Sequence, residues 1–320
     1  MLADLGLWVS ILAVTIRAGT SLLYATIGEI LTERSGILNL GVEGMMIMGA
    51  VTAFAVAFHT GSAVLGALAA VIVGGLLASL HAVLTISLRA DQTVSGLALT
   101  IFGSGLASFL GQKLGPNGQP LVGMIGPRFE RVALPFLSQL PVVGKSVFQV
   151  DVLTYLLYIL IPVTWYWLYR TRPGLHLRAV GEDPRTADAM GINVARTRYA
   201  YTILGGMMCG LGGAHLSLAY TPGWTEGLTA GRGWIAIALV IFAMWDPIRA
   251  VIGALLFGGV TAVQFRLQAA GTTLPAAFLN MMPYIFTIVV LVIITLWETI
   301  SRRVGAPAAL GVPYVREEKG

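Results

Sequence analysis

Nine mainly apolar segments recur along this chain, and their length constrains the fold more than any other feature. A helix needs about 20 such residues to cross a bilayer, because lipid cannot satisfy unpaired backbone groups. We therefore predict an all-α polytopic membrane protein with about nine transmembrane helices (eight to ten), forming a single domain over residues 1–320. The segments are 7–27, 41–58, 63–85, 93–111, 151–169, 199–220, 233–245, 248–267 and 279–299. The seventh is short enough to be a half-helix.

The composition agrees with a membrane protein and excludes several other classes. Hydrophobic residues make up 56% of the chain and charged residues 11%, against roughly 45–50% and about 25% in soluble domains. The net charge is +5, but the basic residues stand between apolar segments rather than on one face, so nucleic acid is not an expected partner. Cys209 is the single cysteine and no Cys/His cluster has metal-ligand spacing, so we expect no disulfide, metal or other cofactor. Residues 1–6 carry Asp4 but no basic residue, unlike a secretory signal, so the first segment is expected to be retained.

The distribution of Lys and Arg predicts the orientation. Counted in or beside the connections 28–40, 86–92, 170–198 and 246–247 and in the C-terminal tail, these residues number 13, whereas in or beside 59–62, 112–150, 221–232 and 268–278 they number 6. The positive-inside bias therefore places the first set and the C-terminus in the cytoplasm and the N-terminus outside.

Two connections are long. The external one, 112–150, contains five prolines and several glycines, so it cannot be one regular helix; we expect it to fold on the outer face as a docking surface. In the cytoplasmic one, 170–198, Asp183 is a candidate N-cap, Pro184 suits the first helical position and Gly191 is a candidate stop. These signals predict a short helix outside the bilayer, which either transmits motion from a cytoplasmic partner or lies on anionic lipid.

Motifs for catalysis are missing from the sequence. Gly144, Lys145 and Ser146 look like the end of a phosphate-binding loop, but position 139, where that loop requires glycine, is Gln139. There is no His-Glu-x-x-His or Gly-x-Ser-x-Gly sequence, and no carboxylate pair within one predicted span. We therefore expect no enzymatic activity. Any process driven by energy in which this chain takes part must draw that energy from another chain or from a gradient.

Polar residues near the first two segments are candidates for the pathway. The connection from Gly28 to Gly44 holds four glycines, Asn39 and three acids, and it is either a solvated interfacial loop or a broken helix beside the pathway. In the second case Asn39, Gly41, Glu43 and Gly44 would lie along the pathway. Arg17 lies near the middle of the first segment, where a cation is costly unless it is paired or wet. It either faces a water-filled pathway or pairs with Glu43 or another acid.

Two histidines and a glycine pair have simpler interpretations. His81 and His215 fall within apolar segments, where a single histidine more often makes structural hydrogen bonds than relays protons. Gly206 and Gly210 form a small-xxx-small pair, which indicates close helix packing.

Four stretches together resemble the importer permeases in the ribose, branched-chain amino acid and nucleoside group of ABC transporters. The run Gly181–Asn193 resembles the segment that docks on the ATPase subunit, and Gly36–Gly44 resembles the glycine-rich motif near the start of these permeases. Glu33-Arg34 before that motif and Met45-Met46 after it look like the nucleoside branch, as do Asp91–Leu99 and the stretch from Gly231 to Pro247. The similarity runs from about Gly19 to Glu298 in the same order. Ribose members carry an extra N-terminal span that this chain lacks, which agrees with an external N-terminus.

This resemblance implies a type II ABC importer in the cytoplasmic (inner) membrane. Two permease chains, this one and a related chain or a second copy, would form the pathway between two ATPase subunits and an extracytoplasmic substrate-binding protein or lipoprotein. The expected substrate is a nucleoside; a simple sugar or branched-chain amino acid is the alternative, and an ion-gradient-driven transporter is a weaker one. The residues expected to couple this chain to the ATPase are Gly181, Glu182, Asp183, Pro184, Arg185, Ala187, Asp188 and Gly191.

Overall fold

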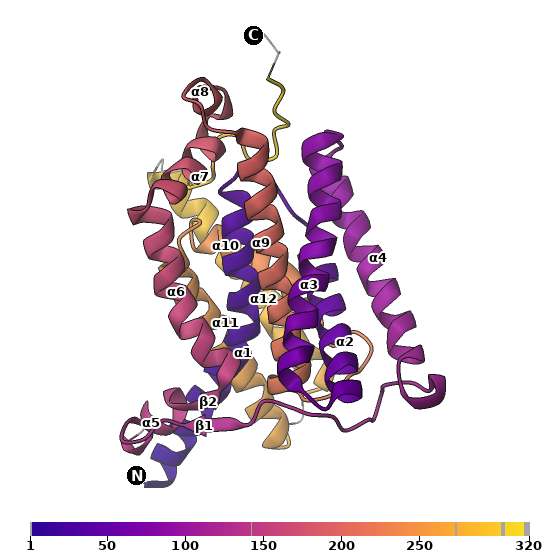
Figure 1. The fold of residues 1–320 in the computed structure, drawn as a ribbon. Coiled ribbons are helices and arrows are strands. Elements are labelled where there is room, and N and C mark those ends of the chain that lie inside the picture. Colours follow the sequence, from indigo (N-terminus) through magenta and orange to yellow (C-terminus); the bar gives the residue numbers. More distant parts are fainter. Residues whose placement is uncertain (1, 142, 273, 302–304, 317–320) are drawn as a thin grey trace.

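The structure, a computed structural model, describes residues 2–141, 143–272, 274–301 and 305–316. Nine long helices correspond to the nine predicted segments (Figure 1). They are α1 (Leu2–Glu33), α2 (Val42–Thr60), α3 (Ala63–Ala82), α4 (Gln92–Lys113), α6 (Val152–Arg170), α9 (Val194–His215), α10 (Arg232–Phe242), α11 (Pro247–Ala269) and α12 (Ala276–Ser301). One turn of π-helix extends α3 (Val83–Ser87) and another extends α9 (Leu216–Tyr220).

Within the described residues, seven helices are long and apolar enough to cross a membrane: Trp8–Glu33, Val42–Thr60, Ala63–Ser87, Gln92–Lys113, Val152–Arg170, Val194–Tyr220 and Pro247–Ala269. Two shorter apolar helices, Arg232–Phe242 and Ala277–Ile293, complete the set. The first of these is α10, whose 11 residues confirm the predicted short seventh segment. Of the basic residues that indicated a cytoplasmic C-terminus, Arg302, Arg303 and Lys319 lie outside the described residues.

The first helix is longer than predicted. It continues through Gly28 and ends at Glu33, so two acids, Glu29 and Glu33, lie one turn apart in the last part of this candidate span. The expectation that no span holds a carboxylate pair was therefore wrong. Apolarity marks where lipid surrounds a helix, whereas this part of α1 is enclosed by other helices and both acids are buried.

Glycines bring the central helices into close contact. A Cβ atom added to Gly206 or Gly210 of α9 would lie 2.5 Å and 2.1 Å from the carbonyl oxygens of Gly74 and Ala70 in α3. This confirms the close packing predicted from the small-xxx-small pair. With α1, α2 and α3 against it, α9 lies in the core, while α3, α4, α6, α11 and α12 expose large apolar side chains such as Ile72, Ile101 and Ile288 to the surroundings.

The two ends of the bundle carry different structures (Figure 1). At the end where the chain begins, residues 112–150 fold into short elements, among them α5 (Val143–Val147) and a hairpin of β1 (Arg131–Ala133) and β2 (Gln149–Asp151), with Arg131 opposite Asp151. This confirms that the long connection is not a regular helix. At the opposite end lie α7 (Arg172–Glu182), α8 (Pro184–Ala189) and the C-terminal residues 305–316. We call these the hairpin end and the α8 end.

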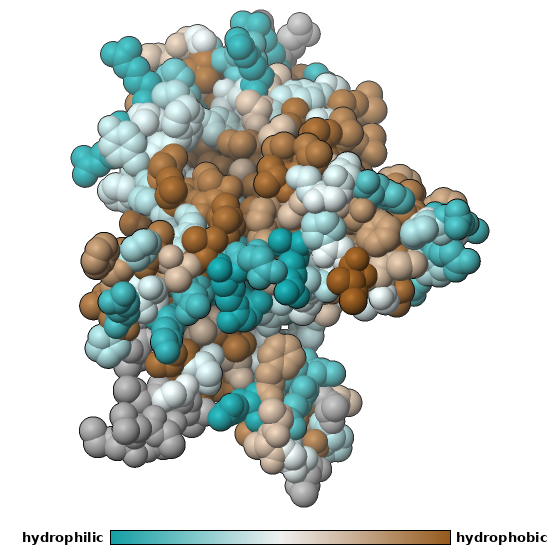
Figure 2. Space-filling model, turned by 60° about the horizontal axis from the view of Figure 1, so that its bottom comes forward, coloured by the Kyte–Doolittle hydropathy of each residue, from teal (hydrophilic) through white to brown (hydrophobic). Residues whose placement is uncertain are grey.

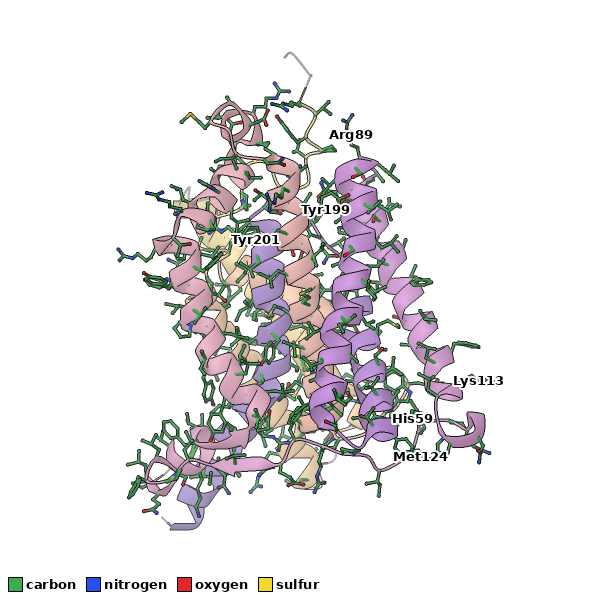
Figure 3. All side chains as sticks on the ribbon, in the orientation of Figure 1. His59, Arg89, Lys113, Met124, Tyr199 and Tyr201 are labelled. Carbon is green, nitrogen blue, oxygen red and sulfur yellow. The ribbon has the colours of Figure 1, made fainter. Side chains whose placement is uncertain are left out.

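Polar and aromatic side chains mark both ends. Figure 3 shows Arg89 and Tyr199 near the α8 end, and His59, Lys113 and Met124 near the hairpin end. Tyr199 and Ser87 share a hydrogen bond of 2.6 Å, and His59 contacts the carbonyl oxygen of Leu114. Figure 2 turns the hairpin end toward the viewer and shows hydrophilic residues gathered over the middle of this face, beside hydrophobic surface.

Candidate functional site

The short helix α8 has the boundaries that its sequence predicts. A carboxylate oxygen of Asp183 accepts hydrogen bonds from the backbone nitrogens of Arg185 (3.0 Å) and Thr186 (3.1 Å), and Pro184 occupies the first turn. Gly191, just after the helix, has φ +85°, a conformation that glycine adopts without strain. Hydrogen bonds from the Thr186 side chain and backbone hold the pKa of Asp183 below its usual range. This helix lies beyond the candidate membrane spans.

A second helix before it, α7, was not predicted from the sequence. The Thr171 side chain accepts a hydrogen bond from the backbone nitrogen of Gly174 (3.2 Å), and Pro173 lies in the first turn. This cap and proline were visible in the sequence, and the same combination identified α8, whose cap Asp183 follows Thr171 in the chain. A small apolar cluster of Val180, Ala187 and Val194 joins α7 and α8 to α9.

The eight residues nominated for coupling fall into three groups. Asp183, Pro184, Ala187 and Gly191 build α8; Gly181, Glu182 and Asp188 contact the C-terminal residues; and Arg185 is exposed. The free surface of α8 comprises Arg185, Thr186 and Ala189, followed by Met190, which is 79% exposed. An exposed apolar side chain at the tip of a short helix suits insertion into a partner's surface.

Residues 305–316, which we call the strap, hold α7 and α8 against the rest of the bundle. The backbone nitrogen of Ala309 donates to the carbonyl oxygen of Gly181 (2.9 Å), and that of Ala308 donates to the Glu182 carboxylate (3.2 Å). Arg316 and Asp188 form an ion pair of 3.1 Å. The strap thereby contacts three of the nominated residues, Gly181, Glu182 and Asp188.

The same strap reaches the α1–α2 connection. The backbone nitrogen of Gly311 donates to the carbonyl oxygen of Gly36 (3.2 Å). Arg198 of α9, which is 2% exposed, donates to the carbonyl oxygens of Ser35 (3.2 Å) and Val312 (3.2 Å). The strap therefore contacts both the α7–α8 region and the connection that follows α1.

Two sequence motifs far apart in the chain meet at this place. The Trp245 indole donates to the Glu33 carboxylate, and the Arg34 guanidinium donates to the carbonyl oxygens of Met244 (3.4 Å) and Trp245 (3.3 Å). Met244 and Trp245 form the turn between α10 and α11 with φ of +51° and +56°. These contacts join the end of α1 to the turn that positions α10.

Asn39 lies at the centre of the α1–α2 connection and is fully buried. Its backbone nitrogen (3.1 Å) and side-chain nitrogen (3.3 Å) both donate to the Glu29 carboxylate, while its side-chain oxygen accepts from the backbone nitrogen of Gly41 (2.9 Å). The connection is thus an ordered segment whose acidic side chains are buried, and not a solvated loop.

Glu43 anchors the beginning of α10. Its carboxylate accepts hydrogen bonds from the Thr229 hydroxyl (2.5 Å) and from the backbone nitrogens of Gly231 (2.9 Å) and Gly233 (2.6 Å). An anionic group at a helix N-terminus is favourable because the first backbone N–H groups have no partner inside the helix. Next to it, a Cβ atom on Gly44 would lie 2.5 Å from the carbonyl oxygen of Leu99, so α2 and α4 touch at this glycine.

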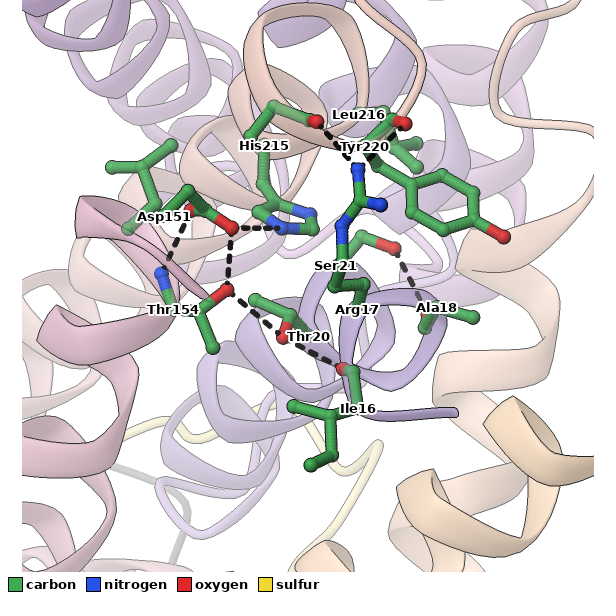
Figure 4. A network of polar contacts seen from close by, with 12 residues as sticks. Ile16, Arg17, Ala18, Thr20, Ser21, Asp151, Thr154, His215, Leu216 and Tyr220 are labelled. Atoms are coloured by element: carbon green, nitrogen blue, oxygen red, sulfur yellow. Dashed lines mark hydrogen bonds and ion pairs between the residues drawn. The ribbon is translucent and has the colours of Figure 1, made fainter. Parts of the chain in front are cut away.

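Arg17 does not contact Glu43. Its guanidinium donates to the carbonyl oxygens of Ala219 (3.0 Å) and Tyr220 (3.2 Å), at the end of the π-helical turn (Figure 4). The Tyr220 ring lies between two arginines, with Arg17 at 5.7 Å and Arg232 at 5.3 Å from its centroid. Carbonyl dipoles and an aromatic face together stabilise this half-buried cation.

A polar network joins α9 to β2 and α1 (Figure 4). The Asp151 carboxylate lies 3.6 Å from His215 and accepts hydrogen bonds from the Thr154 backbone (3.0 Å) and hydroxyl (2.8 Å); the Thr154 hydroxyl is 3.4 Å from that of Thr20. Burial alone would raise the pKa of Asp151, but His215 and the Thr154 hydrogen bonds hold it below its usual range. The other histidine, His81, contacts the Ser95 hydroxyl (2.9 Å) and the Leu38 carbonyl oxygen (3.1 Å).

A cavity of about 350 Å³ lies between α10, α11 and α12. Its lining includes Arg232, Gln264, Asn280, Tyr284 and Phe257, of which sequence analysis nominated none. The available signal was the presence of two amide side chains inside apolar segments. A second cavity, about 370 Å³, lies at the hairpin end beside Arg17, Asp151 and Arg131.

The fold and these sites define a multi-pass helical membrane protein with a capped helix beyond its spans. Residues 10–296 match the family described as "branched-chain amino acid transport system / permease component", and the chain belongs to this permease family.

Characterised and named relatives cover nearly the whole chain. The chain is 42% identical to a putative glucose ABC transporter permease protein of Haloferax volcanii, covering 96% of this chain and 98% of the relative. It is 38% identical to a nucleoside ABC transporter permease protein of Lactococcus lactis (93% and 94% covered) and 34% identical to a guanosine ABC transporter permease protein of Bacillus subtilis (97% and 97% covered). No solved structure matches the chain.

Proposed function

We propose that this chain is the pathway-forming permease subunit of an ABC importer that carries nucleosides. The observation that carries the proposal is the pair of nucleoside and guanosine permease relatives, whose similarity extends over at least 93% of the chain. Glucose is the second candidate substrate, because the putative glucose permease is 42% identical to this chain. Both candidates contain a sugar ring and neither carries a charge.

In this proposal the α8 end faces the cytoplasm and the hairpin end faces outward across the inner membrane. A separate ATPase subunit docks on the exposed face of α8, a second permease chain completes the pathway, and an extracytoplasmic substrate-binding protein docks over residues 112–150. The chain itself hydrolyses no ATP and needs no cofactor. The strap supports the mechanical role, because it contacts Gly181 of α7 and Asp188 of α8 and also Gly36, just after α1. Glu29 and Asn39 lie near this link, and we propose that they and Glu43 maintain the pathway walls.

The test of the substrate is uptake by cells with and without this chain, using labelled guanosine, uridine, glucose, ribose and leucine, with ATP depletion as control. Loss of ATP-dependent nucleoside uptake alone supports the proposal. Loss of glucose uptake with unchanged nucleoside uptake would assign the chain to the second candidate, and loss of leucine uptake would reject both.

Cysteine labelling tests the orientation. In a Cys209→Ala background, Ala189→Cys and Ile125→Cys place thiols at the exposed α8 end and at the 94% exposed position 125 in the 112–150 connection. An impermeant thiol reagent added to intact cells is expected to label position 125 and not position 189, and the pattern should reverse in inverted vesicles. Labelling of both positions from one side would reject the proposed orientation.

Asp183 tests the role of α8. Asp183→Ala removes the N-cap, which stabilises a helix end by about 1 kcal/mol, whereas Asp183→Asn keeps an oxygen acceptor. We expect ATP-driven uptake to fall about fivefold in the alanine variant and to stay near normal in the asparagine variant. Because the native pKa of Asp183 is lowered, the stability from its charged form is present above the ordinary Asp pKa of about 3.9 and is lost as pH falls through the native value. Equal uptake in the two variants would show that the N-cap of α8 has no effect on coupling.

A further inference from the structure

The cavity between α10, α11 and α12 has the dimensions and lining of a small-molecule site. Its volume of about 350 Å³ lies in the range of roughly 300–1,000 Å³ that ligand sites occupy. Leu22 of α1 also contributes to its lining, so the cavity reaches from the outer helices to the central one. Such sites combine apolar walls with a few converging polar groups.

Two amides among the polar groups of this cavity hydrogen-bond each other. The Gln264 side-chain nitrogen donates to the Asn280 side-chain oxygen at 2.8 Å. Among the described residues, neither the Gln264 oxygen nor the Asn280 nitrogen has a hydrogen-bond partner, so an acceptor oxygen and a donor nitrogen remain for a ligand. Gln264 is 7% exposed within a candidate membrane span, where a polar side chain is costly unless a partner satisfies it.

Aromatic rings form the apolar wall. Phe257 is 2% exposed and its ring is held edge-on against Phe286, with centroids 5.1 Å apart. Tyr284 donates from its hydroxyl to the carbonyl oxygen of Ala230, which fixes its ring beside the start of α10. Fixed aromatic faces stack on planar bases, and an amide pair with a free donor and acceptor matches the polar edge of a base.

One aromatic side chain contacts an arginine from each of the two cavities. Arg232 lines this cavity, Arg17 lines the second cavity at the hairpin end, and both guanidinium groups lie against the Tyr220 ring. Tyr220 ends a π-helical turn, a distortion that often occurs at functional sites.

We propose that the cavity between α10, α11 and α12 is a nucleoside-binding site of the permease, in which the base stacks on the aromatic wall and bonds to Gln264 and Asn280. The inference rests on the proposed function, since it names the place where the carried solute contacts this chain. The amide pair confers preference for a solute with a base, because a hexose lacks a planar edge with adjacent donor and acceptor.

Substrate protection of a thiol tests the site directly. Thr261→Cys places a thiol in the cavity lining and leaves both amides intact. In a Cys209→Ala background this variant is assembled with the ATPase, the second permease and the substrate-binding protein in proteoliposomes, and labelled with a small methanethiosulfonate reagent. We expect uridine and guanosine to slow labelling of position 261 at least about fivefold, while glucose and leucine have no effect. The control thiol at Ile125→Cys should label at the same rate with and without nucleoside.

Uptake measurements supply the second readout. Gln264→Leu and Asn280→Leu should each lower nucleoside uptake about tenfold, with the chain present in the membrane at the normal level. Gln268→Leu is the matched control, because Gln268 also donates to Asn280 (3.3 Å) but does not line the cavity, and it should transport normally.

The outcomes separate this inference from the proposed function. If the unaltered importer carries nucleosides but nucleosides do not protect position 261 and the leucine variants transport normally, the site is rejected and the function stands. Protection by glucose alone would reject the nucleoside assignment. If the unaltered importer carries no nucleoside, the proposed function itself is rejected.

Discussion

Replacing Glu43 by alanine is expected to abolish transport and to destabilise the permease. The carboxylate accepts hydrogen bonds from Thr229, Gly231 and Gly233, and no other element supplies acceptors for these groups in the described structure. Leaving a buried donor unpaired costs about 1–3 kcal/mol, so losing three partners should detach the beginning of α10. Uptake should fall below a tenth of normal, and the apparent melting temperature of the purified importer should fall by about 5 °C or more.

Two further substitutions make this expectation specific. Glu43→Gln keeps the shape of the side chain but replaces one acceptor oxygen by an amide N–H₂ group that faces hydrogen-bond donors. We therefore expect an intermediate loss of uptake. Glu226→Ala removes an exposed acid from the same loop, where it accepts from Gln112 (2.9 Å), and should transport normally. Normal uptake and stability in Glu43→Ala would show that α10 does not depend on this anchor.

Local signals predicted the elements, whereas the contacts that make the candidate sites are non-local. Asp183, Pro184 and Gly191 predicted α8 correctly because a cap, a proline and a left-handed glycine act within a few residues. Glu43, by contrast, is separated from its partners on α10 by 186 to 190 residues, and no pattern in the sequence names them.

The first helix shows the limit of apolarity as a signal. Gly28 and Glu29 predicted an end to the span, because glycine and a charged side chain are unfavourable inside lipid-facing helices. In the structure the missing Cβ of Gly28 instead lets α9 approach, and Glu29 is enclosed with Asn39. A residue surrounded by protein follows the rules of a polar core, and sequence alone does not say which helix faces are surrounded.

Arg17 illustrates the same point for a single charge. Its position in a span predicted that Arg17 either faces a water-filled pathway or forms a structural pair. In the second case the expected partner was an acid. The observed partners are backbone carbonyl oxygens of Ala219 and Tyr220, which a π-helical turn leaves available. Backbone acceptors carry no signature in the sequence, so this contact required the fold.

Deleting the strap, by ending the chain after Gly305, is expected to uncouple ATP hydrolysis from uptake. The deletion removes the hydrogen bonds to Gly181, Glu182 and Gly36 and the one from Arg198, each worth about 1 kcal/mol. Without them α7 and α8 remain joined to the bundle by Leu177, which is buried in the main core, and by the apolar cluster around Val180. We expect ATPase activity of the assembled importer to persist while uptake falls about tenfold or more.

The control for this deletion is Arg316→Ala, which removes only the ion pair with Asp188. Arg316 is 79% exposed at its side chain, and exposed pairs contribute about 0–1 kcal/mol, so uptake and ATPase activity should remain coupled. If the deletion loses ATPase activity and membrane insertion together, the strap is needed for folding and not for transmission. If the truncated chain transports as well as the full chain, the strap does not transmit the displacement of α8 to α1. The end of α1 would still be joined to α10 by the contacts of Arg34 with Met244 and Trp245.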